Sequence, residues 1–183
     1  MYSGNNPVAI KSQDAIRNEF LKLLKIKPFN KISIKEINEQ AKLARQTFYL
    51  LFSSKEEILE FHLDEVFLSF VNKVKENKNK SIEELVAMFL VFFEEHRELL
   101  KSLIDNKFHG LISGKFIQYF DILIDDMKIF KKNVSKLEIK YFKVFVSGAM
   151  VEVLSLWLND DNAEIEELSP VVKKIIFGEM LEV

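Results

Sequence analysis

The chain has 183 residues, of which 48% are apolar, so it is long enough for a small module joined to a larger body with its own core. Only 5 Gly and 3 Pro leave few signals for the many turns of an all-β protein, which favours a mostly helical fold, and the absence of Cys excludes disulfides, thiolate metal sites and cysteine nucleophiles. The net charge of −2 conceals an asymmetry, because residues 1–55 sum to +6 and the remainder to −8, the pattern of a basic module on an acidic body.

Apolar residues recur at helical spacing through most of the chain. Four helix starts carry the Ser-x-x-Glu capping box: Ser33/Glu36, Ser54/Glu57, Ser81/Glu84 and Ser135/Glu138. The predicted helices cover residues 12–25, 34–40, 45–51, 55–77, 82–105, 108–130 and 136–158, with an acidic loop over 159–168 and a last helix starting at Pro170.

No segment predicts export or a membrane span. Residues 1–6 lack a basic region followed by an apolar stretch, so we expect a flexible arm instead of a signal peptide. The longest nearly uncharged stretch, 144–158, has about 15 residues, whereas a bilayer span needs roughly 20. We therefore expect a soluble, cytoplasmic protein without a membrane partner.

A first helix packed across two short helices joined by a tight turn is the layout of a helix-turn-helix, whose second short helix enters the major groove of DNA. The residues resemble one family in particular. The segments Ile-Ser-Ile-Lys-Glu-Ile at 32–37, Ala41 and the run RQTFYLLFSSKEEI at 45–58, together with Phe29, closely resemble the TetR family pattern. This resemblance implies an all-α protein of about nine helices, with a three-helix helix-turn-helix domain over 1–54 and a C-terminal helical bundle for dimerisation and ligand sensing over 55–183.

Seven residues are candidates for DNA contacts because of their donors and their places on the two short helices. They are Ser33, Lys35, Arg45, Gln46, Thr47, Tyr49 and Lys55. Hydroxyl and ammonium groups suit phosphate oxygens, and the resemblance implies that Tyr49 and Lys55 touch the backbone. Arg45 and Gln46, at the start of the recognition helix, can address guanine and adenine, although Arg45 as one more phosphate contact stays open.

Three residues depart from the family pattern. Lys42 stands where the turn usually has Gly, Ala44 replaces the usual Ser or Thr cap of the recognition helix, and Asn38 occupies a position that is usually small and apolar. These departures leave open an alternative function, in which a TetR-like helical protein binds a partner protein instead of DNA.

The helix expected over 136–158 is apolar nearly all round, so it must be covered on several sides. Together with the last helix and their symmetry mates, it predicts a four-helix interface in a homodimer, which would bind a palindromic operator. The expected interface residues are Phe145, Gly148, Ala149, Val151, Leu154, Trp157, Val172, Ile176 and Phe177. A buried central helix in a monomer is the alternative.

Aromatic residues on the long helices are candidates for a pocket that takes an unknown small-molecule effector, unless they form core; a protein effector is the other possibility. They and two polar candidates are Phe89, Phe92, Phe93, His96, His109, Phe116, Tyr119, Phe120, Tyr141 and Phe145. The sequence has no phosphate-cradling Gly loop, no Gly-x-Ser-x-Gly elbow and no metal-ligand spacing, so we expect neither an enzyme nor a cofactor or metal. The C-terminal part is loosely similar to TetR-type activators of dihydroxyacetone kinase operons.

Overall fold

The structure is a computed structural model, and it describes residues 2, 4–76, 81–127, 130, 133–160, 164–176 and 180, without the side chains of residues 82 and 124–127. Within this part of the chain there are nine α-helices and one short 3-10 turn but no strand, which confirms the predicted all-α fold. The chain divides into two compact units, Met1–Val66 and Phe67–Val183. Helix α4 (Lys55–Glu76) contributes its first half to the N-terminal unit and its second half to the C-terminal unit.

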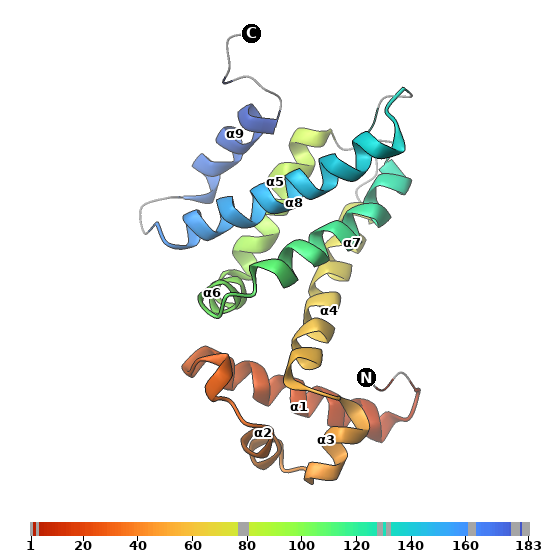
Figure 1. The fold of residues 1–183 in the computed structure, drawn as a ribbon, viewed down its shortest axis with the longest axis vertical. Helices are drawn as coiled ribbons and strands as arrows, with labels where there is room; N and C mark the ends of the chain where they lie inside the picture. The colour runs from red at the N-terminus through yellow and green to blue at the C-terminus, as the bar shows by residue number, and fades with distance from the viewer. Residues whose placement is uncertain are drawn as a thin grey trace. The chain divides into compact units, whose positions relative to one another are not determined.

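The N-terminal unit is built on three helices around one apolar centre (Figure 1). They are α1 (Pro7–Ile26), α2 (Ile34–Ala41) and α3 (Arg45–Leu51), with the 3-10 turn η1 (Phe29–Lys31) between the first two. α1 begins five residues before its predicted start because the Asn6 side chain accepts from the backbone N–H of Val8 and Pro7 suits the first turn. The arm before it is bound as well, since the backbone N–H of Tyr2 donates to Leu51 O at 2.9 Å.

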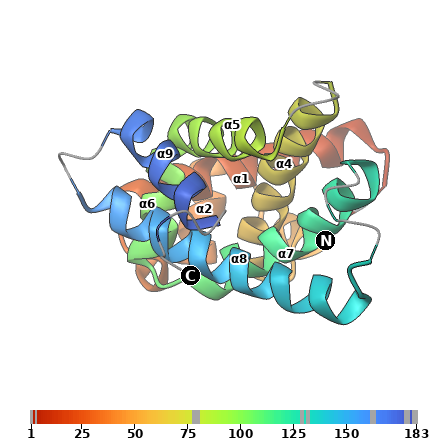
Figure 2. The same cartoon turned by 90° about the horizontal axis from the view of Figure 1, so that it is seen from above.

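The C-terminal unit holds the second half of α4 and five further helices. They are α5 (Ile82–Glu95), α6 (Arg97–Asp105), α7 (His109–Met127), α8 (Lys136–Leu158) and α9 (Ile165–Ile176). α7 lies beside α8, and α5 lies beside α9 (Figure 2), while α6 contacts both α5 and α8. Two of the four predicted capping boxes are complete, at Ser81/Glu84 and Ser135/Glu138.

The single helix predicted over 82–105 is wrong, because the chain breaks at His96. Its φ of −111° and ψ of 19° end α5, its ring stacks on Phe92 with centroids 4.5 Å apart, and its Nδ1 lies 2.8 Å from Phe92 O. After the break, the Arg97 guanidinium lies over the Trp157 ring of α8, 4.2 Å from its centroid. The new direction lets α6 pack its apolar side into the unit.

The predicted start of the last helix at Pro170 is also wrong. α9 begins at Ile165, and Pro170 lies inside it. Ile165 is buried, which anchors the first turn, and Glu166 and Glu167 place negative charge near the positive end of the helix dipole. Part of the predicted acidic loop is therefore helix.

Candidate nucleic-acid interface

Two phenylalanines fix the orientation of α3. Phe48 and Phe52 are four residues apart and almost fully buried, with ring centroids 6.1 Å from each other. Ile16 and Phe20 of α1 and Ile37 of α2 are fully buried in the same unit, where α1, α2 and α3 contact one another in pairs. One side of α3 is thus held in the core, which leaves the other side in solvent.

The turn between α2 and α3 contains two of the three residues that depart from the family pattern. Lys42 ends α2 with φ 56° and ψ 38°, a left-handed conformation that is strained for a residue with a Cβ. Ala44 precedes α3 with an extended backbone but offers no side-chain acceptor to the first N–H groups of the helix. The turn keeps its geometry through backbone bonds, such as Leu43 N–H to Asn38 O at 2.9 Å.

Four side chains make up the outer face of α3, which we call the reading face: Arg45, Gln46, Tyr49 and Leu50. Arg45 Nη2 donates to Tyr49 Oη at 3.3 Å. This hydrogen bond raises the pKa of Arg45, so the guanidinium stays positively charged. Leu50 is 70% exposed and was not predicted as a site residue. Helical spacing alone could have predicted this exposure. Phe48, Leu51 and Phe52 face the core, so residue 50 lies on the opposite side of the helix.

Lys55 is bound inside its own unit. Its ammonium donates to Phe29 O at 2.9 Å and to Ile32 O at 2.6 Å, and lies 4.3 Å from the centroid of the Phe29 ring. An ammonium has three donors, so one is left for a phosphate oxygen. Lys55 therefore links the start of α4 to the turn before α2, in addition to the contact with DNA that we expect of it.

The other predicted contacts vary in exposure. Ser33 caps α2 by accepting from the N–H of Glu36 at 3.1 Å, which leaves its own hydroxyl proton to donate. Lys35 is exposed and lies 3.7 Å from the carboxylate of Glu39, whereas Thr47 is half-buried. Glu36 pairs with Lys27 instead of completing the capping box, and this hydrogen bond lowers the pKa of Glu36.

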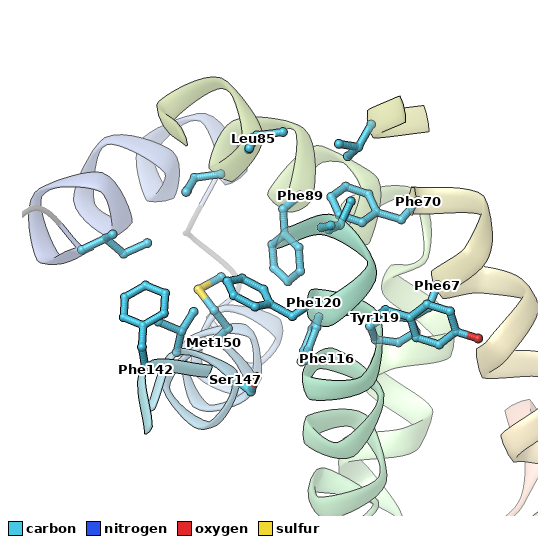
Figure 3. A pocket seen from close by; sticks show the side chains of 15 residues that line it. Phe67, Phe70, Leu85, Phe89, Phe116, Tyr119, Phe120, Phe142, Ser147 and Met150 are labelled. Atoms are coloured by element: carbon cyan, nitrogen blue, oxygen red, sulfur yellow. The ribbon is translucent and has the colours of Figure 1, made fainter. Parts of the chain in front are cut away.

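The C-terminal unit contains an apolar cavity of about 140 Å³ (Figure 3). Four predicted pocket residues line it: Phe89, Phe116, Tyr119 and Phe120. The other six do not line it: Phe92, Phe93, His96, His109, Tyr141 and Phe145. Phe92 and Phe93 are core residues, while Tyr141 and Phe145 are 65% and 72% exposed on the outer side of α8. Four of the ten predicted residues therefore share one cavity, and the other six lie elsewhere in the unit.

The nine predicted dimer residues do not share one surface. Val151, Leu154, Trp157 and Val172 are buried inside the unit, and they pack against its own helices, so they are not available to a second copy. Phe145, Gly148 and Ala149 lie on the outer side of α8, where a Cβ added at Gly148 meets no atom within 4 Å. Ile176 lines the cavity, and Phe177 lies outside the described residues. Because α8 is apolar on nearly all sides, the sequence did not reveal which side is buried.

The sequence and the fold both match known regulators. Residues 21–60 match the profile described as bacterial regulatory proteins of the tetR family, and residues 80–178 match the transcriptional regulator C-terminal region TetR_C_8. The chain is 26% identical over 161 residues to the HTH-type transcriptional regulator YxbF of Bacillus subtilis, a match that covers 83% of this chain but only 41% of YxbF.

Two solved structures share the fold. The dihydroxyacetone kinase operon activator DhaS has a TM-score of 0.60 at 20% identity and covers 92% of this chain and 95% of its own. Lin0861 of Listeria innocua has a TM-score of 0.75 at 14% identity, with 96% and 94% covered. Since the C-terminal profile alone spans more than half of the sequence and the N-terminal profile covers the helix-turn-helix, the chain belongs to the TetR family of transcriptional regulators, which are not enzymes.

Proposed function

We propose that the chain is a one-component regulator that binds a palindromic operator as a homodimer and responds to an effector. The observation that carries the proposal is the reading face, because a guanidinium, an amide, a phenol and an exposed leucine project from a helix whose other side is anchored in a core. These are the groups that read base edges and touch phosphates in the major groove.

Within the reading face we assign base contacts to three side chains. Arg45 provides two donors for guanine, and Gln46 provides a donor and an acceptor for adenine. Leu50 provides an apolar surface for the methyl group of thymine. Tyr49, Ser33 and Lys35, with the remaining donor of Lys55, are assigned to phosphates.

The dimer is proposed to form through the outer face of α8 and the exposed side of α9. This surface contains large exposed apolar side chains: Leu137, Tyr141, Val144, Phe145 and Leu156 on α8, with Val171 and Ile175 on α9. On α8, Leu137, Tyr141, Val144 and Phe145 recur at three- and four-residue spacing, and such a row of exposed apolar side chains supports a contact between two copies. α8 is also long and apolar enough to cross a membrane by length and composition alone, but its inner side packs in the core of the unit.

The effector is proposed to bind in the cavity of the C-terminal unit. Its wall includes Phe67, Phe70 and Val74 of α4, the helix whose first half belongs to the N-terminal unit. A bound molecule that favours one position of these three residues would shift α4, and α4 continues into the unit that carries the DNA-binding residues.

The test is selection of binding sites from a random duplex library with the full chain, followed by sequencing. We expect a palindrome whose half-sites lie about one DNA turn, ~34 Å, apart. Arg45→Ala is expected to cost about 1–3 kcal/mol and to relax one position of each half-site, whereas Lys22→Ala on the exposed side of α1 serves as the charge-matched control and keeps the sequence preference.

A second candidate function follows from the weak points of the turn. The unpartnered amide of Asn38 and the missing cap at Ala44 favour a chain that has kept the fold and binds a partner protein instead of DNA. Recovery of only nonspecific duplexes, with an affinity independent of Arg45, would support this second function and contradict the first.

A further inference from the structure

The cavity of the C-terminal unit is lined by side chains without charge. It lies among α4, α5, α7, α8 and α9, and the described residues that line it include no Asp, Glu, Lys, Arg or His. Among these described residues, Ser147 and Tyr119 have polar side chains, and the hydroxyl of Tyr119 is turned away from Phe142 and Met150 in Figure 3. A buried charge without a partner is costly, so this lining selects against carboxylates, phosphates and ammonium groups.

One ion pair joins two helices of the cavity wall. Lys143 on α8 forms an ion pair with Asp121 on α7, and neither residue lines the cavity. Their charges neutralise each other between the two helices that form one wall. An anionic ligand would therefore have to compete with Asp121 for this lysine.

The space inside the cavity fits a ligand of about one ring. Its volume is about 140 Å³. A cavity of about 150 Å³ lined by Leu, Ile and Phe in another protein stays dry and binds benzene or xenon. The two spaces have the same chemistry and nearly the same volume, so the same class of guest fits.

The walls are already assembled from aromatic rings. The Phe89 and Phe116 rings have centroids 5.1 Å apart, and Phe67 lies 5.0 Å from Phe116 and stacks on Tyr119 at 5.5 Å. Rings that pack on one another keep their places without a guest, and they present edges and faces to an aromatic ligand.

We propose that this cavity binds a small, uncharged, apolar molecule of single-ring size. The role of this molecule as the effector rests on the proposed function. Its binding to the cavity does not. The probes are toluene and benzoate, which share one ring and differ in charge. By calorimetry on the full chain, we expect toluene to bind saturably and benzoate to bind about tenfold more weakly or worse.

Two variants of α5 locate the binding. Val86 lines the cavity, so Val86→Phe fills it and is expected to reduce toluene affinity about tenfold or more. Val91 is 51% exposed and does not line the cavity, so Val91→Phe is the matched control and keeps the affinity of the unaltered chain. Equal toluene affinity in both variants, or tighter binding of benzoate or octanoate than of toluene, would overturn the proposal.

A crystal of the unaltered chain under xenon pressure gives a second measurement that does not depend on the folding of a variant. We expect xenon density beside Phe89, Tyr119 and Met150, and a cavity empty of xenon would contradict the proposal.

Titration of the selected operator with and without toluene separates the two proposals. If toluene binds but operator affinity is unchanged, the ligand class holds and the effector role fails; if toluene does not bind while the operator does, the ligand class fails alone.

Discussion

The amide of Asn38 is buried in the helix-turn-helix, and neither its nitrogen nor its oxygen has a hydrogen-bond partner within the described part of the chain. An unpartnered buried polar group costs about 1–3 kcal/mol, and Ala is the better helix former. We expect Asn38→Ala to raise the free energy of unfolding in urea by about 1 kcal/mol. Asn38→Asp, with the same shape but a charge, should lower it; a less stable Ala variant would mean that the amide has a partner.

The cap of the recognition helix offers a second change at a single residue. Ala44 has the extended backbone that a capping residue needs, with φ −69° and ψ 147°, but it has no side-chain oxygen. Ala44→Ser should therefore stabilise the N-terminal unit by about 1 kcal/mol in thermal unfolding. Ala44→Val is the control, since Val caps no better than Ala, and an equal gain in both variants would exclude capping as the cause.

The sequence could predict features of the helix-turn-helix that depend on residues close together in the chain. The family pattern marked Lys42 as a residue in place of a turn glycine and Ala44 as a residue in place of a cap, and Lys42 does have a left-handed backbone while Ala44 makes no side-chain cap. The carbonyl contacts of Lys55 join residues 23 and 26 positions apart, so no local pattern contains them. Asn38 was recognised as unusual, but only packing shows that its amide has no partner.

The ends of two helices were predicted, but a break within a helix and the buried side of another were not. α3 and α8 have their predicted bounds, since a cap or a turn marks their ends. The break at His96 has no Gly or Pro and depends on the ring of Phe92 and on the packing of α6. α8 is apolar nearly all round, so its length was evident but its buried side was decided by the neighbouring helices.

The start of α8 carries a pH dependence. Hydrogen bonds from Ser135, first its side chain and then its backbone N–H, lower the pKa of Glu138. A lowered pKa means that the carboxylate stabilises the fold fully above its ordinary pKa and that this contribution is lost as the pH falls through the lowered value. We expect the melting temperatures of the unaltered chain and Glu138→Gln to differ at pH 7 and to converge as the pH falls below about 4.

The control for this pH dependence removes the main cause of the shift. In a Ser135→Ala background, Glu138→Gln should change the melting temperature less at pH 7, because the hydroxyl that favours the carboxylate is absent. An unchanged effect in that background would attribute the stabilisation to the backbone N–H of residue 135 and the helix dipole instead of the hydroxyl.

At the scale of the whole molecule, positive charge is concentrated in the first part of the chain, before α4. The first 55 residues sum to +6 and the remainder to −8. A regulator needs positive potential only where it meets phosphates, and its acidic body limits adhesion to DNA elsewhere. The affinity for the selected operator should therefore fall steeply with salt, since each phosphate contact releases counterions, and a flat salt dependence would contradict the assigned contacts.

The dimer is tested most directly at Gly148, on the outer side of α8. A Cβ added there meets no atom within 4 Å, and Leu favours a helix over Gly, so Gly148→Leu should leave the folded protomer as stable as before or more so. A second copy packed closely on this face would clash with the new side chain. We therefore expect sedimentation velocity to show a shift from dimer to monomer.

The matched control for this variant is on α7. Gly114 is exposed, and a Cβ added there also meets no atom within 4 Å, so Gly114→Leu makes the same change on a helix to which we assign no interface. It should keep the dimer. Because a palindromic operator needs two recognition helices on one complex, Gly148→Leu should also lose operator affinity while Gly114→Leu keeps it. A persistent Gly148→Leu dimer would move the interface away from the outer face of α8 and would leave its exposed aromatic residues without the partner proposed for them.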